Sequence, residues 1–310
     1  MRYMIKILLM FMMFSLLVAS GTLAADYPNR PVRLLTMVER HAQIDLLTRG
    51  LSQRLSDEFS KPFTVINRPG GFHGSVMARE LQVASPDGYT LGVSATAAFT
   101  YAPHAIKTEY AFDDFIFISM LGLNQSGIVA RPDRPWNTLK EAFEWARNEN
   151  APLTYMFQGV DDRDAMQRIA AAEGVDLLLM PSTGGPSIIQ SVMGGHADLG
   201  HLGAILFQYV QDGRLKLLAA TTPDRLTEIQ EVPTLREQGW DEAVEMFVVL
   251  AAHKGVSASI VLRLENVMDK LARDDEFLAF ITRDLKMEPV PFGREHAEKY
   301  MQEAYERFKR

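Results

Sequence analysis

The sequence predicts an α/β protein folded into two lobes. Apolar, β-rich runs alternate with stretches of helical period, which is typical of α/β lobes with largely parallel sheets. About 285 residues remain after an N-terminal export signal, a length that suits two lobes of roughly 100–150 residues each. Two long apolar runs, 115–123 and 243–252, are the candidate crossings between the lobes, and two crossings would form a hinge. The alternative is one continuous sheet.

The first third of the chain alternates strands and helices. Apolar residues recur at steps of three and four from Ile44 to Leu55, so 44–59 is predicted as an amphipathic helix. The other predicted elements of this part are strands at 32–38, 63–66 and 90–94 and a helix at 73–84. Gly88 after Asp87 marks a turn before the third strand.

The middle of the chain continues the alternation, and its C-terminal third is helical. Strand and helix candidates between the two long apolar runs lie at 128–130, 138–147, 153–157, 163–173, 176–180, 186–193, 198–201, 204–211 and 215–220. Three further helices are expected near 257–272, 275–284 and 294–308. The apolar stripe from Val261 to Leu271 has helical spacing and indicates core packing rather than a partner site. No internal repeat stands out.

The N-terminus has the pattern of a signal peptide over residues 1–25. Arg2 and Lys6 precede an apolar run from 7 to 18, and mostly small residues follow it up to Ala25. The run is shorter than the roughly 20 residues that a membrane span needs. We therefore expect export to the periplasm with cleavage near Ala24 or Ala25. The alternative is a buried N-terminal helix, but such a helix would have no polar outer face.

Composition excludes several classes of protein. The chain has no cysteine, which excludes a disulfide framework, a thiol nucleophile and the lipid-bearing cysteine of a lipoprotein. Its formal net charge is −7, and loss of Arg2 and Lys6 with the signal makes it more negative. An acidic surface argues against nucleic acid or an anionic membrane as the partner.

Several short phrases stand in a fixed order along nearly the whole mature chain. They are YPNRPVRLL at 27–35, NRPGG at 67–71, PDGYTLG at 86–92, GGHAD at 194–198, DGRLKLLA at 212–219, VPTL at 232–235 and EPV at 288–290. In this order the chain resembles the solute receptors of the tripartite tricarboxylate transporter family (Bug/TctC-like), with divergent ligand loops. Single phrases such as Pro-Asp-Gly-Tyr-Thr only describe a turn before a strand.

The resemblance implies a fold, a function and partners. The fold would be a periplasmic binding protein fold of two lobes, a Venus flytrap with two hinge crossings. Lobe 1 would span 26–120 plus 245–310, and lobe 2 would span 121–244. Such a protein closes over a small organic acid and docks transiently on the subunits of a membrane permease. We expect a monomer with no cofactor and no metal.

The first ligand loop departs from the family pattern. The resemblance implies a glycine-rich loop after the first strand, whose free amides at a helix start would receive a carboxylate. Here His41, Ala42 and Gln43 occupy the glycine positions, and only Asp45 keeps the family character. Arg40, His41 and Gln43 are therefore predicted to replace backbone donors with side-chain donors. The alternative is a relaxed loop with Arg40 solvated, and Asp45 is either a ligand contact or a helix-start charge.

The other candidates follow later strands. Ala95 and Thr96 follow the third strand and are expected to offer backbone and hydroxyl groups to a ligand, since α/β proteins bind at the carboxyl ends of strands. Phe157 and Gln158 end a strand of the second lobe, where Phe157 either enlarges the ligand wall or packs at the strand end. The acidic residues 161, 162 and 164 are interpreted as charges at a helix start.

A glycine turn in the second lobe is the best-preserved candidate. Ser182, Thr183, Gly184 and Gly185 precede a helix whose first turn accepts Pro186, so backbone amides and hydroxyls are available to an anion. The alternative is a plain turn between strand and helix. His201 ends the next strand and is predicted to face the ligand, the alternative being a packing or hydrogen-bonding role.

No enzyme motif is found. A Gly-x-Ser-x-Gly elbow, a phosphate loop and a paired-histidine zinc motif are absent from the sequence. The leading hypothesis is a periplasmic solute-binding protein that delivers a carboxylate to a permease. The alternatives are a receptor that presents to a membrane sensor kinase, a divergent member that has lost carboxylate binding, and an enzyme of small-molecule metabolism.

Overall fold

The computed structural model describes residues 27–309, so the predicted signal peptide at 1–25 lies outside the described residues. The chain divides into two compact units. Within the described residues, unit 1 runs to Leu121 and includes Val248–Leu278 and the segment from Pro291 onward. Unit 2 consists of Gly122–Phe247 and Ala279–Val290. The α/β prediction is confirmed, because both units combine a sheet with helices.

Most of a six-stranded sheet of order β11-β4-β10-β3-β1-β2 lies in unit 1, whereas β11 and the end of β4 fall in unit 2. Its strands are β1 (Val32–Thr36), β2 (Phe63–Asn67), β3 (Thr90–Ala95), β4 (Phe115–Asn124), β10 (Phe247–His253) and β11 (Met287–Glu288). The central strand β1 pairs in parallel with both β2 and β3, whereas β10 runs antiparallel to β3. In this sheet, the prediction of largely parallel strands therefore holds for the β2-β1-β3 part and not for the pairing of β3 with β10.

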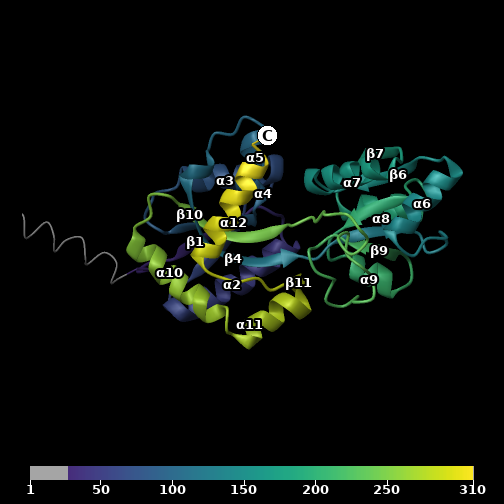
Figure 1. The fold of residues 1–310 in the computed structure, drawn as a ribbon. Helices are drawn as coiled ribbons and strands as arrows, with labels where there is room; N and C mark the ends of the chain where they lie inside the picture. Colours follow the sequence, from purple (N-terminus) through teal and green to yellow (C-terminus); the bar gives the residue numbers. More distant parts are fainter. Residues whose placement is uncertain (1–26, 310) are drawn as a thin grey trace, which may run out of the picture. The chain divides into compact units, whose positions relative to one another are not determined.

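Helices from both ends of the chain cover this sheet, so N-terminal purple and C-terminal yellow elements meet in unit 1 (Figure 1). Helix α2 (Gln43–Phe59) begins one residue before the predicted start and buries the predicted stripe Ile44, Leu47, Leu51 and Leu55. The remaining helices are α3 (Ser75–Gln82), α4 (Ala97–Thr100), α5 (Ala102–Ala105), α10 (Ala258–Leu271), α11 (Asp275–Ala279) and α12 (Arg294–Arg307).

Unit 2 has a five-stranded sheet of order β7-β6-β8-β5-β9. Its elements are β5 (Gly127–Ala130), α6 (Leu139–Glu149), β6 (Leu153–Phe157), α7 (Val160–Glu173), β7 (Leu177–Pro181), α8 (Gly185–Met193), β8 (Leu199–Leu202), α9 (Leu206–Gln211) and β9 (Lys216–Ala220). Strand β6 is parallel to β7 and β8, and β5 is antiparallel to β8 and β9.

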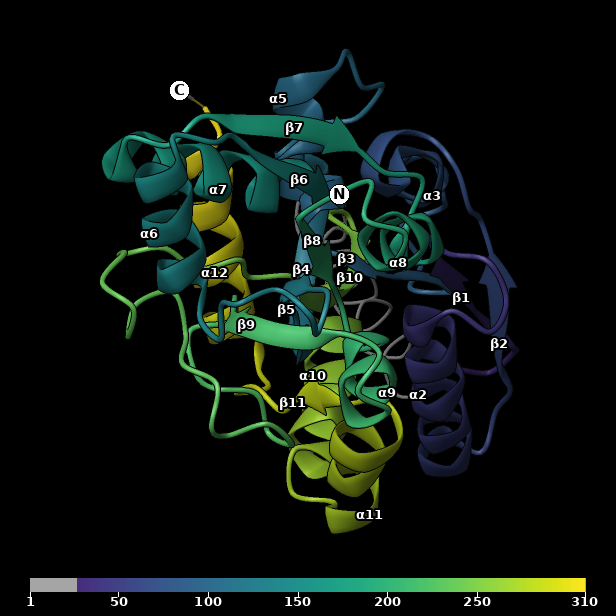
Figure 2. The same cartoon turned by 90° about the vertical axis from the view of Figure 1, so that its right-hand side faces the viewer.

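The unit 2 sheet is covered on both faces. Helices α6 and α7 lie on one face and α8 and α9 on the other (Figure 2). The first face holds a core around Trp136, Phe143 and Tyr155, and the second a core around Ile188 and Phe207. Burial on both faces explains why the strands of this unit read as continuous apolar runs.

The two units repeat one topology that the sequence does not reveal. In unit 1 the order β1-α2-β2-α3-β3 builds three parallel strands with β1 in the middle. In unit 2 the order β6-α7-β7-α8-β8 does the same around β6. Helix α2 in unit 1 therefore corresponds to α7 in unit 2, and α3 corresponds to α8.

The structure corrects some predicted elements. The run 243–252 is extended only in part, because β10 begins at Phe247 and Val244 instead donates its amide to the Thr221 carbonyl. The predicted helix at 73–84 begins only at Ser75, after a single 3₁₀ turn over Phe72–Gly74. The predicted helix at 275–284 changes after Ala279 into a π-helix, Phe280–Asp284.

The unit boundaries differ from the predicted lobes by one to three residues in the two apolar runs, and by a whole segment near the C-terminus. Both apolar runs contain a boundary, between Leu121 and Gly122 in β4 and between Phe247 and Val248 in β10. Residues 279–290, predicted to belong to lobe 1, fall in unit 2. Strand β11 pairs with the end of β4 that lies in unit 2, and Gln125 donates to the Lys286 carbonyl at 3.1 Å. The exact lobe bounds stay a prediction.

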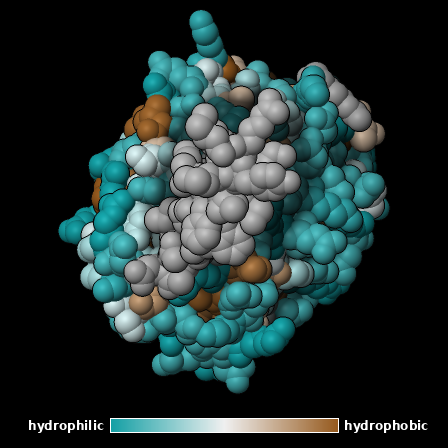
Figure 3. Space-filling view, turned by 90° about the vertical axis from the view of Figure 1, so that its left-hand side faces the viewer, coloured by the Kyte–Doolittle hydropathy of each residue, from teal (hydrophilic) through white to brown (hydrophobic). Residues whose placement is uncertain are grey.

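The coloured part of the face in Figure 3 is mostly hydrophilic, and its apolar side chains lie in small separate groups. Isolated surface apolar residues of this kind are normal in globular proteins. Among residues 27–309, none of the helices combines the length and the apolar character that a bilayer crossing requires.

Candidate ligand-binding loops

The predicted site residues lie at the carboxyl ends of the parallel strands in both units. In unit 1 they follow β1 or lie at and just after the end of β3, and in unit 2 they lie at and just after the end of β6, after β7, or in β8. Ligands of α/β proteins bind at this edge, where loops and helix starts converge. Each unit therefore presents one such edge, described separately below.

The first loop keeps a glycine-like backbone without glycine. His41 has φ of +70°, in the left-handed region that favours glycine, whereas Ala42 is extended with φ of −69° and ψ of 155°. A side chain in this region costs about 1–2 kcal/mol. The loop thus retains the turn of a glycine-containing loop, but the His41 side chain now projects from it.

Asp45 explains how this turn is held. Its buried carboxylate accepts the His41 amide at 2.9 Å, the Arg49 guanidinium at 2.9 and 3.0 Å, and the Asn67 amide at 2.8 Å. Burial by itself would raise the pKa of Asp45, but the hydrogen bonds from Arg49, Asn67 and His41 lower it to about 2. We assign Asp45 to positioning the loop, and its direct contact with a ligand stays a prediction.

Arg40 and Gln43 lie on either side of this turn. Arg40 is exposed, and among residues 27–309 it has neither an ion pair nor a hydrogen bond from its side chain. Gln43 is the first residue of α2 and is partly buried. Both placements are compatible with a ligand role, which stays a prediction for each.

Met37, which sequence reasoning missed, joins three loops of unit 1. Its sulfur accepts the Ser94 hydroxyl at 3.0 Å and the Ala95 amide at 3.2 Å. A Cβ on Gly74 would lie only 2.9 Å from the Met37 Cβ, so the loop after β2 also packs closely on Met37. The Ala95 amide is therefore already engaged, while Thr96 is buried directly after β3. A methionine after a strand carries no sequence signal for this role.

An aromatic group in the second loop of unit 1 was also missed. The His73 ring lies edge-on to Phe72 and Tyr101, with centroids 4.5 and 5.3 Å apart. Burial lowers the pKa of His73 below its usual range. Like His41, this histidine has a positive φ, of +50°. Because 73–84 was predicted as one helix, the 3₁₀ turn at Phe72–Gly74, which positions His73, was not predicted.

In unit 2, Asp162 holds the loop after β6. Its carboxylate accepts the Tyr155 hydroxyl at 2.8 Å, the Gln158 amide at 3.0 Å and the Gly159 amide at 2.6 Å. This confirms its prediction as a residue of the helix start. Asp45 and Asp162 are each the third residue of equivalent helices, and each holds the loop before its helix. Asp45 accepts one backbone amide of its loop and Asp162 accepts two.

Phe157 and Gln158 differ in their surroundings. The partly buried Phe157 packs against the core on the α6 and α7 face, as the strand-end interpretation expected. The Gln158 side chain is exposed, while its amide is taken by Asp162. A ligand contact from either side chain stays a prediction.

The turn before α8 depends on one glycine. Gly184 has φ of +129° and ψ of 176°, a conformation essentially restricted to glycine. The Ser187 hydroxyl donates to the Gly184 carbonyl at 2.8 Å and accepts the Thr183 amide at 3.2 Å. The Ser182 hydroxyl is buried without a hydrogen-bond partner among the described residues, as is that of Thr36 at the end of β1. Buried unpaired hydroxyls are uncommon and indicate a water or ligand partner.

Replacing Gly184 with alanine is expected to lower the free energy of unfolding by about 1–3 kcal/mol, because the turn must leave its conformation. Gly185→Ala is the matched control, since a Cβ there would meet Ile205 and Leu202 only at ordinary contact distances of 3.5 and 3.8 Å. Thermal unfolding of both variants measures the difference. Equal stabilities would show that the turn tolerates a side chain at Gly184.

His201 is buried inside unit 2. Its Nε2 lies 3.2 Å from the Thr221 hydroxyl, and its Nδ1 lies 3.7 Å from an Asp162 oxygen. Burial lowers the pKa of His201, although the Asp162 charge opposes this. The hydrogen-bonding alternative accounts for Nε2, and a direct ligand contact stays a prediction.

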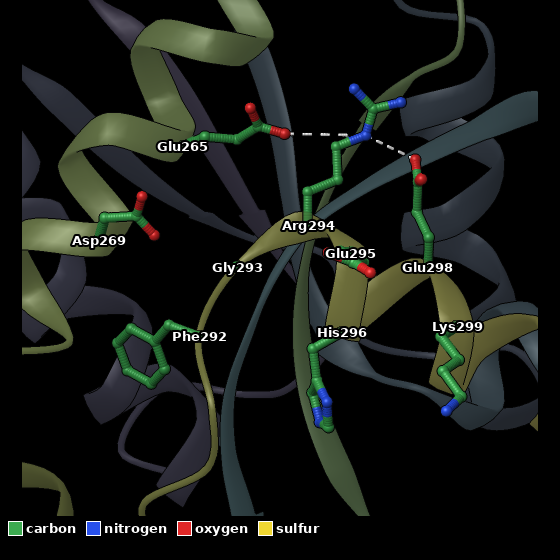
Figure 4. Close-up of a pocket in the computed structure, with 9 residues that line it drawn as sticks. All are labelled: Glu265, Asp269, Phe292, Gly293, Arg294, Glu295, His296, Glu298 and Lys299. Carbon is green, nitrogen blue, oxygen red and sulfur yellow. Dashed lines mark hydrogen bonds and ion pairs between the residues drawn. The ribbon is translucent and has the colours of Figure 1, made fainter.

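A separate hollow of about 710 Å³ lies on unit 1 between α10 and the start of α12 (Figure 4). Its central Arg294 lies 2.6 Å from Glu298 and 3.7 Å from Glu265. None of the predicted site residues lines it. Within residues 27–309, no group of three or more histidine, aspartate or glutamate side chains is arranged to hold a metal ion.

The sequence and the fold both match known proteins. The profile of the family described as "Tripartite tricarboxylate transporter family receptor" matches residues 47–310. The protein BugT of Bordetella pertussis is 24% identical over 257 residues, which cover 80% of this chain and 78% of BugT.

Two solved structures illustrate the similarity of fold. A TctC solute binding protein from Polaromonas, with no ligand, is 25% identical with a TM-score of 0.76, covering 91% of this chain and 98% of its own. MatC from Rhodopseudomonas palustris, solved with bound malate, is 21% identical with a TM-score of 0.73, covering 91% of this chain and 99% of its own. The second likeness supports the fold alone.

Proposed function

This chain belongs to the tripartite tricarboxylate transporter receptor family, and we propose that it captures a small organic acid for delivery to a membrane permease. Members of the family are periplasmic solute-binding proteins, and neither the family nor the fold is that of an enzyme. The α/β fold of this chain, with its two sheets, agrees with membership of this family.

The matched loops of the two units carry the proposal. Asp45 and Asp162 each fix the loop after a central parallel strand, Asp45 by accepting the His41 amide and Asp162 by accepting the amides of Gln158 and Gly159. The helix starts behind these loops carry partial positive charge, which favours an anionic group. Thr36 and Ser182 add buried hydroxyls that have no partner among the described residues. This combination of donors suits a carboxylate.

The class of ligand is supported by a neighbour of the same fold. MatC was solved with malate, a dicarboxylic acid. In this chain His41 occupies a position with glycine-like backbone, and its side chain narrows the approach to the loop amides. We therefore propose an organic acid held partly by side-chain donors. Enclosure of the ligand between the two predicted lobes stays a prediction.

Titration calorimetry with a panel of mono-, di- and tricarboxylic acids tests this function. We expect at least one acid to bind, and solution scattering to show compaction when it does. Absence of binding to every acid on the panel would contradict the carboxylate proposal.

Arg40 provides a sharper test of the first loop. Arg40→Ala is expected to weaken the binding of an acid found in the panel by about 1.5–3 kcal/mol, the range of a hydrogen bond to a charged group. Arg307→Ala, at the exposed end of α12, removes the same charge from the same unit and serves as the control. If both variants bind as tightly as the wild type, Arg40 belongs to the solvated surface.

A second candidate function is ligand sensing for a membrane sensor kinase. This hypothesis starts from the departure of the first loop from the family pattern, since His41, Ala42 and Gln43 stand where the family has glycines. Uptake of the bound acid in cells with and without the permease discriminates the two. Delivery predicts uptake that requires both this protein and the permease, whereas sensing predicts a transcriptional response without uptake.

A further inference from the structure

We propose that His201 positions the 158–159 loop of unit 2 through Asp162, so that binding at this loop depends on whether His201 carries a proton. The proposal rests on the proposed function, since it assigns a regulator to the same loop. His201 is therefore a positioning residue, which acts on the loop through another side chain.

The Nδ1 atom of His201 is buried and unpaired among the described residues. His201 is 2% exposed, and its Nδ1 has no hydrogen-bond partner among the described residues. The nearest charged atom that faces it is Oδ2 of Asp162, at 3.7 Å. This separation is too long for a hydrogen bond, but a charge on the ring would interact strongly with the carboxylate across it.

The opposite side of the ring holds a chain of hydroxyl groups. Nε2 lies 3.2 Å from Oγ1 of Thr221, which lies 2.7 Å from Oγ of Ser126. When the His201 ring is neutral, its hydrogen is expected on Nδ1, because a lone pair on Nδ1 would be repelled by the negative Asp162 carboxylate. Nε2 then accepts a hydrogen bond from the Thr221 hydroxyl. Protonation makes Nε2 a donor, so the Thr221 hydroxyl must turn and donate toward Ser126. The two forms of His201 therefore require different hydrogen-bond arrangements.

Few titratable groups face this ring. Helix α7 contributes Asp162, and strand β6 contributes Tyr155, which donates to Asp162. The segments before β5 and after β9 contribute only the hydroxyls of Ser126 and Thr221. Burial together with Asp162 raises the pKa of Tyr155 well above its ordinary value, so Tyr155 does not titrate near neutral pH.

The sign of the effect follows from burial. Because burial lowers the pKa of His201 below the ordinary 6.5, the ring is neutral at neutral pH and gains its proton only in acid. The unfolded chain binds this proton more readily than the folded one. The contribution of neutral His201 to the free energy of unfolding is therefore complete above pH 6.5, and it declines as the pH falls below that value.

Protonation of His201 affects the 158–159 loop through one oxygen atom of Asp162. Oδ2 of Asp162, which faces His201, is also the acceptor for the Gln158 amide and the Tyr155 hydroxyl. An imidazolium draws this oxygen toward Nδ1 and weakens its bond to the Gln158 amide. Gly159 donates to the other oxygen and follows the carboxylate as it turns. We expect the loop to lose its geometry, and its ligand, in acid.

A ligand-free measurement tests the positioning role. In NMR spectra recorded from about pH 7.5 down to the pH at which the His201 ring gains its proton, the Gln158 and Gly159 amide signals should titrate together with the ring. In His201→Gln, which can still bond to Thr221 but cannot take up the proton, this titration should vanish. His196→Gln removes an exposed histidine of the same unit and should leave it unchanged. Amides that do not titrate in the wild type, or that still titrate in His201→Gln, would overturn the proposal.

A ligand measurement then tests the consequence, with malate as the probe. The wild type should bind malate about fivefold or more weakly at the acidic end of this range, while His201→Gln should show no such dependence. Equal pH dependence in both proteins would refute the coupling. If malate binds neither protein, malate is not the ligand and an acid found in the panel replaces it as the probe, whereas the amide titration still decides the role of His201. The wild-type titration needs no variant, so it remains decisive even if His201→Gln does not fold.

Discussion

Asp162→Ala is expected to lower the free energy of unfolding of unit 2 by about 3–5 kcal/mol, the largest effect among the substitutions considered. The carboxylate is the acceptor for three donors, the Tyr155 hydroxyl and the Gln158 and Gly159 amides. Each donor left buried without an acceptor costs about 1–3 kcal/mol. Alanine cannot replace any of these bonds, and the loop after β6 is expected to lose its fixed geometry as well. Chemical denaturation measures the change.

A neighbouring residue gives the control for Asp162. Asp164 lies on the same helix with a half-exposed side chain, and within residues 27–309 its one ion pair is with the adjacent Arg163 at 2.7 Å. Exposed ion pairs contribute about 0–1 kcal/mol, so Asp164→Ala should change stability little. Binding of an acid should be lost in Asp162→Ala and kept in Asp164→Ala. Similar stabilities for the two variants would show that Asp162 does not hold the loop.

Asp45→Ala is expected to destabilise unit 1 by about 2–4 kcal/mol, the second largest effect. The substitution leaves the His41 amide, the Asn67 side chain and the partly exposed Arg49 without their shared acceptor. His41 would also lose the bond that holds it in its left-handed conformation. Asp57→Ala is the control on the same helix, because Asp57 is exposed and accepts only from Gln53. Chemical denaturation of both variants measures the change in the free energy of unfolding.

The pKa of Asp45 adds a pH dependence to this test. The pKa falls from the ordinary 3.8 to about 2 in the folded protein, so the contribution of Asp45 is complete above 3.8. It is lost as the pH falls toward 2 and the carboxylate takes up a proton. The stability difference between wild type and Asp45→Ala should therefore shrink across this window. A difference that stays constant would mean that the ionised carboxylate contributes nothing specific.

Most of the secondary structure could be predicted because local signals decide it. The helix 44–59 follows from apolar spacing, and α2 buries those same residues. The strand 153–157 was predicted with its observed bounds, since a short apolar run lies between a proline and a glycine. The first residues of the predicted run 243–252 were predicted wrongly, because β10 begins only at Phe247. Apolar spacing continues through Val244, but the amide of that residue pairs with Thr221 instead of a strand.

The sequence predicts the strand ends at which the candidate residues lie, but it does not predict the hydrogen bonds that hold them there. Residues after strands point to the carboxyl edge, and the order of the phrases identifies the family. Asn67, which donates to Asp45, is 22 positions away in the sequence, and His201, whose Nδ1 lies 3.7 Å from Asp162, is 39 positions away from it. Contacts across such separations leave no periodicity or motif in a single sequence. Met37 was missed for the same reason, since its role comes from Ser94, Ala95 and Gly74.

The sequence by itself determined the α/β class, the positions of the main helices and strands, and the family, because these depend on spacing between near neighbours and on the order of short phrases. The tertiary structure alone decided that His41 keeps a glycine-like turn, that Asp45 and Asp162 hold equivalent loops, and that residues 279–290 belong to unit 2. The physical reason is the same in each case. Hydrogen bonds and strand pairings between distant residues fix these features, and they form only when the chain has folded.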